Sequence, residues 1–533
     1  MKRFVMAIMV IALIAPAVFA GGTAEGTTGT AAAFNETGFP IVDEPITLTM
    51  AAGKHPLSGD IVQFDLWKQY EEMTNVRIEA DFVPAASWAE RRNLLLASAD
   101  LPDILGNVPP ADIVRYSAQG LFLPMNDLIA QYAPYVRQLF ETRPGIERAL
   151  RLPDGEIYSL PRVNEFRFRE VPDMMYINKA WLDRVGLPIP TTTAELETAL
   201  RAFRDNDVNL SGDPNDEIPM SFMFTDELSL EPWSLLGMFG TLDNAQHRIV
   251  MDGEVIFTPF MPEYREGMKW FARMYAEGLI DPEVFTHSRR EYAAKGTGGD
   301  YAVYGLAFEW FVDSVVGTER GEAEYVTLPP LEGPDGHQLW HRVEDSYFAG
   351  KGWFLMGYDN ENPEVTMRWF DYIYEPDFSL QWSRGPWDVG LDRRDDGTIV
   401  FREPPAGMSY NEFRFSISPG GATGWSVLND MYDQIDLDPS STKKLHEDWP
   451  MYQPYLIEEA YPDLFFTLEE SERLATLTAD IQNYVQQMKA RWIIGELDID
   501  ATWAEFEQTL RRMGVEEYVQ IQQTALDRHM GRD

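Results

Sequence analysis

A strand–helix–strand pattern near the start of the chain limits the fold most strongly. Apolar residues alternate over Ile46–Met50 and again over Val76–Phe82, which is typical of strands with one buried face. Between these stretches, four apolar residues are spaced so that they would lie on one face of a helix: Val62, Leu66, Tyr70 and Met73. Two strands joined through a helix form a βαβ unit, which favours a mostly parallel sheet. We therefore expect an α/β fold, and the pattern further along the chain predicts mainly helices at the C-terminal end.

The N-terminus has the features of a secretory signal peptide. Lys2 and Arg3 precede the apolar run Phe4–Ala20, and the small residue Ala20 stands before Gly21. A transmembrane anchor is the alternative, but the run is short and no stop-transfer flank follows it. We expect export with cleavage after Ala20, followed by a flexible leader over residues 21–45.

Composition excludes several classes of function. The 533 residues include no cysteine, which excludes disulfides, thiolate catalysis, cysteine-based zinc sites and a lipid-modified N-terminal cysteine. We therefore expect a soluble periplasmic protein. We also expect it to be a monomer. The formal net charge of −42 would repel nucleic acid and anionic membranes, so neither is expected as a partner.

A loop rich in oxygen-bearing side chains follows a predicted helix near residue 205. The first, third, fifth and seventh positions from Asp207 carry oxygen donors, with Gly212 at the sixth, as a Ca²⁺ loop requires. The acids that close the loop arrive before the twelfth position, so it is not an EF-hand. The candidate ligands are Asp207, Asn209, Ser211, Asp213, Asp216 and Glu217. The alternative is a surface turn in which these residue types serve backbone geometry. A bound Ca²⁺ would be structural.

No motif for catalysis stands out. The chain has no phosphate-binding loop of the P-loop type, no G-x-S-x-G and no H-E-x-x-H, since His446-Glu447 continues into Asp-Trp-Pro. A glycosidase needs two carboxylates that face each other across a sugar, and the sequence neither supports nor excludes such a pair. We predict that the protein is not an enzyme.

Tryptophans next to polar residues point instead to a binding site. Sugar rings have apolar faces and hydroxyl rims, so their sites combine flat aromatic rings with carboxylate, amide and guanidinium groups. Core packing is the alternative for each single tryptophan. The candidate ligand-binding residues are Trp88, Arg167, Trp233, Glu309, Trp310, Trp382, Trp387 and Asp388.

Several stretches together resemble the extracellular solute-binding proteins of carbohydrate ABC importers, in the branch that includes alginate-oligosaccharide binders. The matching stretches are Ala97–Ile104, Gly120–Leu128, Tyr176–Leu182, Pro190–Phe203, Asp207–Pro219, Leu235–Gly240, Tyr275–Glu283 and Ile481–Arg528. The resemblance implies that the loop described above binds Ca²⁺ through Asp207, Asn209, Asp213, Asp216 and Glu217. Ser211 departs from the usual Asn or Asp and is a weaker donor. The missing lipid-anchor cysteine is a second departure.

The resemblance also implies a fold and a mechanism. The expected fold has two discontinuous α/β lobes joined by crossover strands: residues 46–165 with 348–400, and residues 166–347 with 401–533. A sugar or oligosaccharide would bind in the cleft between them, close the hinge and be presented to the permease subunits of an ABC transporter. Two alternatives stay open. One is the same fold with a peptide or another solute, and the other is a secreted polysaccharide-degrading enzyme.

Overall fold

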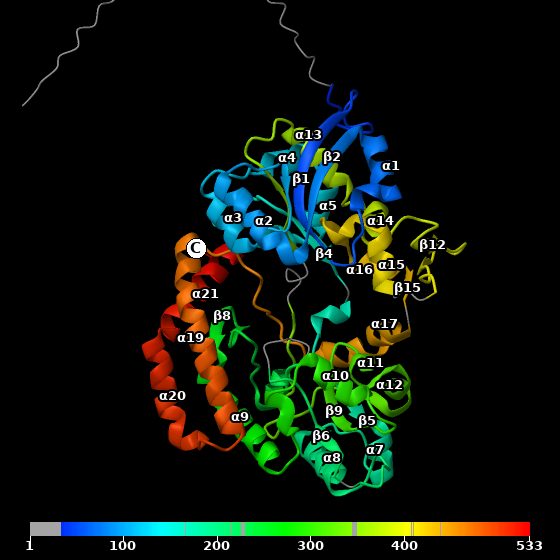
Figure 1. Cartoon of the computed structure of the whole chain (residues 1–533). Helices are drawn as coiled ribbons and strands as arrows, with labels where there is room; N and C mark the ends of the chain where they lie inside the picture. Colours follow the sequence, from blue (N-terminus) through cyan, green and yellow to red (C-terminus); the bar gives the residue numbers. More distant parts are fainter. Residues whose placement is uncertain are drawn as a thin grey trace, which may run out of the picture.

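Two main sheets, each with its own helices, form the two lobes of the protein (Figure 1). The computed structural model describes residues 33–532 apart from positions 166, 214, 225–229, 344–348, 407, 409 and 438. The signal peptide and residues 21–32 of the leader expected from the sequence lie outside the described residues. The α/β class is confirmed.

The first sheet has six strands in the order β14–β4–β11–β3–β1–β2. These strands are β1 (Ile46–Lys54), β2 (Val76–Pro84), β3 (Ile104–Leu105), β4 (Leu160–Asn164), β11 (Ala349–Met356) and β14 (Trp425–Val427). β1 pairs in parallel with β2 and β3, whereas β11 is antiparallel to both of its neighbours. The parallel β1–β2 pair, joined through helix α1 (Asp65–Thr74), is the βαβ unit that the alternating pattern predicts.

Ten of the described helices belong to the lobe that this sheet forms, and α1 is one of them. The others are α2 (Ala85–Ser98), α3 (Pro110–Ser117), α4 (Asn126–Tyr132), α5 (Pro134–Thr142), α6 (Pro144–Leu150), α13 (Pro363–Tyr372), α14 (Pro376–Arg384), α15 (Tyr410–Ile417) and α16 (Asn429–Tyr432). The core of the lobe contains a tryptophan cluster, in which Trp67 stacks on Trp382 at 5.4 Å between ring centroids and contacts Trp369 edge-on. A small sheet of β12 (Leu391–Arg393), β13 (Ile399–Phe401) and β15 (Ile435–Asp436) lies at the side of this lobe.

The second sheet has four strands in the order β10–β5–β9–β6. These are β5 (Met174–Asn178), β6 (Ile218–Met220), β9 (Tyr304–Glu309) and β10 (Tyr325–Leu328). Every residue of β5 and of β9 is buried, which accounts for their nearly continuous apolar sequence. The helices of this lobe include α7 (Lys179–Val185), α8 (Thr193–Asp205), α9 (Pro262–Ala276), α10 (Arg289–Thr297), α11 (Asp313–Val316), α12 (Thr318–Glu324), α17 (Pro439–Lys443) and α18 (Trp449–Tyr452).

Three long helices form the C-terminal end, as the sequence predicts. α19 (Leu468–Ile493), α20 (Ile499–Met513) and α21 (Val515–Met530) pack beside α9, and their buried residues join the core of the second lobe. A hairpin of β7 (Arg248–Met251) and β8 (Glu254–Phe257) packs against α21. None of the helices in the described part of the chain has the length and apolar character needed to cross a membrane.

The chain passes between the lobes three times. It leaves the first sheet after β4, returns to it at β11, and leaves again between β15 and α17. The core differs from the expected division in one respect: residues 401–437, which we assigned to the second lobe, lie with the first. The reason is that β14 pairs with β4, and that Trp425, Val427 and Tyr432 are buried in the first core.

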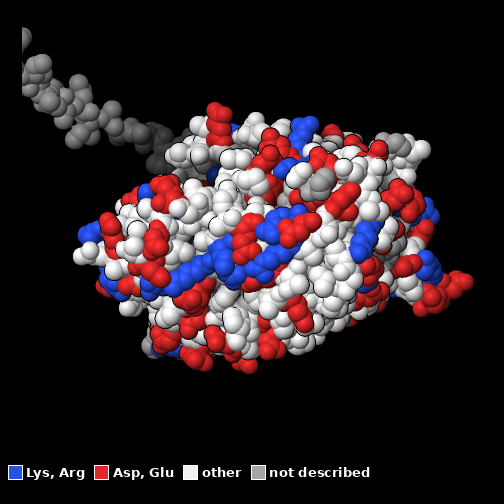
Figure 2. Space-filling view, turned by 90° about the horizontal axis from the view of Figure 1, so that it is seen from below, with Lys and Arg blue, Asp and Glu red and all other residues white. Residues whose placement is uncertain are grey.

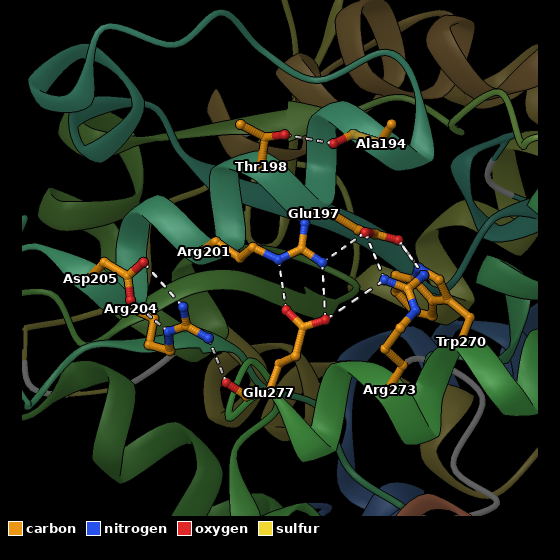
Figure 3. A network of polar contacts seen from close by, with 9 residues as sticks. All are labelled: Ala194, Glu197, Thr198, Arg201, Arg204, Asp205, Trp270, Arg273 and Glu277. Carbon is orange, nitrogen blue, oxygen red and sulfur yellow. Dashed lines mark hydrogen bonds and ion pairs between the residues drawn. The ribbon is translucent and has the colours of Figure 1, made fainter.

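Ion pairs and hydrogen bonds fasten α8 to α9 on the outer end of the second lobe (Figure 3). Arg201 of α8 contacts Glu277 at 2.6 Å and Glu197 at 3.0 Å, and Arg273 of α9 contacts Glu197 at 2.6 Å. Trp270 donates from Nε1 to the same Glu197 carboxylate at 3.0 Å. Figure 2 shows a band of Lys and Arg on this end of the molecule with Asp and Glu side chains along it. These surface cations are therefore largely neutralised.

The carboxyl group of Asp371 should make stability depend on pH. It accepts a hydrogen bond from Val136 N at 2.9 Å, and burial raises its pKa from 3.8 to about 7. The folded state therefore holds this proton more tightly than the unfolded state. The protonated Asp371 carboxyl therefore adds to the free energy of unfolding, and this stabilisation is fully present below about pH 4. It is lost as the pH rises toward 7, and the loss is on the order of 2–4 kcal/mol.

We expect Asp371→Asn, which keeps a carbonyl acceptor for Val136, to be more stable than the wild type at pH 8 and to lose part of this pH dependence. Calorimetric melting temperatures at pH 5 and pH 8 would measure the difference. Equal pH slopes in the two proteins would contradict the prediction.

Candidate ligand cleft

A large cavity lies where the two lobes face each other. Its volume is about 1040 Å³, near the upper end of the roughly 300–1,000 Å³ that small-molecule pockets occupy. Residues of the first lobe form one wall, from β4, α14, β13, α15, α16 and β15. Residues of the second lobe form the other wall. They come from η2 (Arg167–Glu170), from α10, from α11 and from the segment between β9 and α11. Both lobes therefore contribute to the cavity, as closure around a ligand requires.

The second-lobe wall is built around the end of β9. Trp310 and Phe311 follow that strand directly and line the cavity. The hydroxyl of Tyr176 on the neighbouring strand donates to Trp310 O at 3.0 Å, which fixes the backbone that carries the indole. Arg169 lies with its guanidinium carbon 5.8 Å from the centre of the Trp310 ring. The wall thus offers a flat aromatic surface with a cation beside it.

The first-lobe wall places aromatic rings next to hydrogen-bonding groups. Phe401 and Tyr410 stack with 5.7 Å between ring centroids. Arg384 donates from Nη2 to the Tyr432 hydroxyl at 3.1 Å, and that hydroxyl donates to Asn164 Oδ1 at 2.5 Å. All five residues line the cavity. The two walls together provide apolar ring faces, hydroxyl, amide and guanidinium groups, which is the chemistry that a sugar surface needs.

The tertiary structure separates the candidate ligand residues into several groups. Trp310 lines the cavity, and Glu309 is buried directly before it, where it pairs with Arg289 at 2.8 Å. Trp387 is half-buried beside Arg393, and Asp388 is exposed; neither lines the cavity. The side chain of Arg167 lies outside the described residues.

Three of the candidate tryptophans lie in the interior instead of the cleft. Trp88, Trp233 and Trp382 are at most 4% exposed. Trp88 donates to Asn107 O at 3.0 Å, and Trp382 donates to Thr423 Oγ1 at 2.7 Å. Trp233 lies under the ammonium group of Lys489, 3.7 Å from the ring centre. Their polar sequence neighbours suggested exposure, but packing against distant segments buries the rings.

Sequence reasoning missed most of the first-lobe wall. Arg384, Phe401, Tyr410 and Tyr432 come from four different elements, and no short motif connects them. Arg384 lies three positions before the candidate Trp387 in the same short stretch, and this proximity is the nearest signal that the sequence contains.

The oxygen-rich loop after α8 folds tightly on itself. Gly212, at a φ of 90°, donates from its backbone N to Asp207 Oδ2 at 3.1 Å. Asn209 accepts from Ser211 N at 2.7 Å and donates to Asp216 Oδ1 at 2.6 Å. Asp213 N in turn donates to Ser211 Oγ at 3.1 Å. The loop therefore brings its oxygen-bearing side chains to one place.

Two carboxylate oxygens in this loop are buried and have no hydrogen-bond partner among the described residues. They are Asp207 Oδ1 and Glu217 Oε2, and burial, with Asp216 close by, raises the pKa of Glu217. Unsatisfied buried oxygens of this kind fit a cation. In the described part of the chain, however, no group of three or more His, Asp or Glu side chains is placed to hold a metal ion. The amide, hydroxyl and carbonyl oxygens of the loop would have to complete the ligand set.

Comparison with known proteins agrees with this architecture. Residues 55–378 match the family described as bacterial extracellular solute-binding protein. The fructooligosaccharide ABC transporter substrate-binding protein FusA of Streptococcus pneumoniae is 31% identical over 509 residues, which cover 92% of each chain.

Solved structures show the same fold. FusA in complex with kestose has a TM-score of 0.75 at 29% identity and covers 92% of this chain and 100% of its own. A FusA EF-hand mutant in complex with fructo-nystose has a TM-score of 0.74 over the same shares at 29% identity. The alginate-binding protein AlgQ2 without calcium ion, at 24% identity and a TM-score of 0.65, shares the fold over 91% of this chain and 99% of its own.

These relatives are binding proteins rather than enzymes. In this protein, the cavity lies between the two lobes, where a binding cleft is expected. The protein belongs to the family of bacterial extracellular solute-binding proteins.

Proposed function

We propose that this protein is an extracytoplasmic receptor that captures an oligosaccharide in the cleft and delivers it to the permease of an ABC transporter. The observation that carries the proposal is the cleft itself. Trp310 lines the wall from the second lobe, and the rings of Phe401 and Tyr410, the amide of Asn164 and the hydroxyl of Tyr432 line the wall from the first lobe. The similarity to FusA over 92% of both chains supports a carbohydrate ligand.

Hinge closure is the mechanism that this arrangement supports. A ligand that contacts both walls binds the closed form better than the open form and shifts the population toward it. The three segments that join the lobes leave the two cores separate, so that rotation between them does not disturb the packing of either core. The closed form would be the one presented to the permease. We propose that the mature protein acts as a monomer after removal of residues 1–20.

The receptor proposal predicts binding without turnover. In a thermal-shift screen, a ligand at a hundred times its Kd should stabilise the folded protein by about 2.7 kcal/mol. Kestose, maltotriose, trigalacturonate and short peptides form the first panel, and chromatography afterwards should return the bound sugar intact. Stabilisation by a peptide alone would remove the carbohydrate assignment, and cleavage of the sugar would favour an enzyme.

Trp310→Ala should weaken sugar binding by about tenfold or more, because it removes the flat surface on which a ring would stack. Isothermal titration calorimetry measures the change in Kd. Trp382→Phe is the matched control: this indole is fully buried in the first core, so the substitution should lower Tm and leave Kd unchanged. Full affinity in Trp310→Ala would place the ligand elsewhere.

We further propose that the loop after α8 binds a structural Ca²⁺ through Asp207, Asn209, Ser211, Asp213, Asp216 and Glu217. The support is the pair of buried, unpartnered carboxylate oxygens and the raised pKa of Glu217. The existence of an EF-hand mutant of FusA adds to it. The ion would neutralise the carboxylates and fix the connection between α8 and β6.

Chelation tests the calcium proposal. EDTA should lower Tm, and Asp207→Ala together with Asp216→Ala should abolish that response. Asp205→Ala removes an exposed carboxylate that pairs with Arg204 just before the loop, and this control should keep the response to EDTA. A protein that contains no calcium by mass spectrometry and does not respond to EDTA would show that the loop is only a turn.

A further inference from the structure

The cleft is rich in arginine, although the chain as a whole has a net charge of −42. The arginines that line it are Arg169, Arg289, Arg384, Arg394 and Arg402, whereas the carboxylates among the lining residues are Glu403 and Asp436. In a protein with so many acidic residues, this local excess of guanidinium groups over carboxylates indicates that the arginines have a role in the cleft.

Three of these arginines have carboxylate partners. Arg289 pairs with Glu309 at 2.8 Å, Arg394 with Asp436 at 2.6 Å, and Arg402 with Asp392 at 2.6 Å. They resemble the arginines of the network between α8 and α9, where every guanidinium faces a carboxylate (Figure 3). Paired cations of this kind attract an anion only weakly.

Arg384 is different. Its Nη2 donates to the Tyr432 hydroxyl, its guanidinium carbon lies 5.2 Å from the centre of the Phe401 ring, and its Nε is buried without a hydrogen-bond partner. Among the described residues no carboxylate lies within ion-pair distance of it. This cation lines the cleft without a countercharge.

A second guanidinium lies next to it. Arg414 of α15 donates from Nε to Ser383 O at 2.8 Å, directly beside Arg384, and it too has no ion-pair partner in the described part of the chain. Burial, and then the charge of Arg384, lower the pKa of Arg414 to about 9. Burial disfavours the charge of both groups, and for Arg384 the neighbouring Tyr432 and Tyr410 outweigh burial and raise its pKa. The two guanidinium charges repel each other, and an anion would relieve this repulsion.

An anion on the ligand would supply the missing charge. A guanidinium group binds a planar carboxylate through two parallel hydrogen bonds, and these bonds are stronger where water is excluded. Neutral sugar hydroxyls would satisfy the donors of Arg384 but would leave both charges uncompensated.

We propose that the cleft selects an oligosaccharide that carries a carboxylate, as in a uronic acid unit, and that Arg384 binds this group with Arg414 supporting it from behind. The inference rests on the proposed function and narrows its substrate class from oligosaccharides in general to acidic ones.

The test compares a charged sugar with its uncharged counterpart. We expect trigalacturonate, or a mannuronate or glucuronate trisaccharide, to bind at least tenfold more tightly than its methyl ester, and the affinity for the acid to fall as NaCl rises from 50 to 500 mM. Arg384→Gln should raise Kd for the acid at least tenfold and leave Kd for the ester nearly unchanged. Arg393→Gln, which removes an exposed arginine outside the cavity, is the matched control and should change neither value.

The outcomes separate the inference from the proposed function. Binding of kestose or of the ester as tight as that of the acids would overturn the inference and leave the receptor proposal standing. Preference for a sulfated or phosphorylated trisaccharide would overturn the carboxylate assignment. Failure of every charged and neutral sugar to bind would overturn both proposals.

Discussion

The arrangement of the molecule depends on the fact that neither sheet can be completed by one continuous stretch of chain. β4, β11 and β14 must lie side by side to cover the apolar residues of the first core, although they come from three distant parts of the chain, residues 160–164, 349–356 and 425–427. The chain therefore passes between the lobes three times. Asn164, Arg169 and Asp436, which lie at the ends of these passages, line the cleft between the lobes.

Charge is distributed according to what each surface contacts. On the outer end of the second lobe, Arg201 and Arg273 have Glu197 and Glu277 within ion-pair distance, which helps to hold α8 against α9. In the cleft, the guanidinium group of Arg384 donates to the hydroxyl of Tyr432 instead, and that of the neighbouring Arg414 donates to the backbone carbonyl of Ser383. Arginine thus helps to pack two helices at the first site and is available to bind a ligand at the second. Among the described residues, only the first site has carboxylates within ion-pair distance of these arginines.

Local pattern was enough to predict several features. The alternation over Ile46–Met50 and over Val76–Phe82 predicted β1 and β2, because the alternation depends only on which residues will face a core. The loop that begins at Asp207 could also be recognised, since its donors lie within eleven consecutive positions. The boundary near residue 400 was placed wrongly, because the pairing of β14 with β4 joins segments that share no sequence signal.

The sequence by itself determined the α/β class, the compact oxygen-rich loop and the supply of aromatic rings, since each depends on composition or on spacing along the chain. Only the tertiary structure decided which rings are available to a ligand. Trp88, Trp233 and Trp382 are buried, because burial of a large indole in a core is favourable wherever a partner for its N–H is within reach or a cation covers its face. Trp310 alone among the candidate tryptophans lines the cavity, and Phe401, Tyr410 and Arg384 line it from the first lobe, because the two separately packed sheets leave this cavity between the lobes.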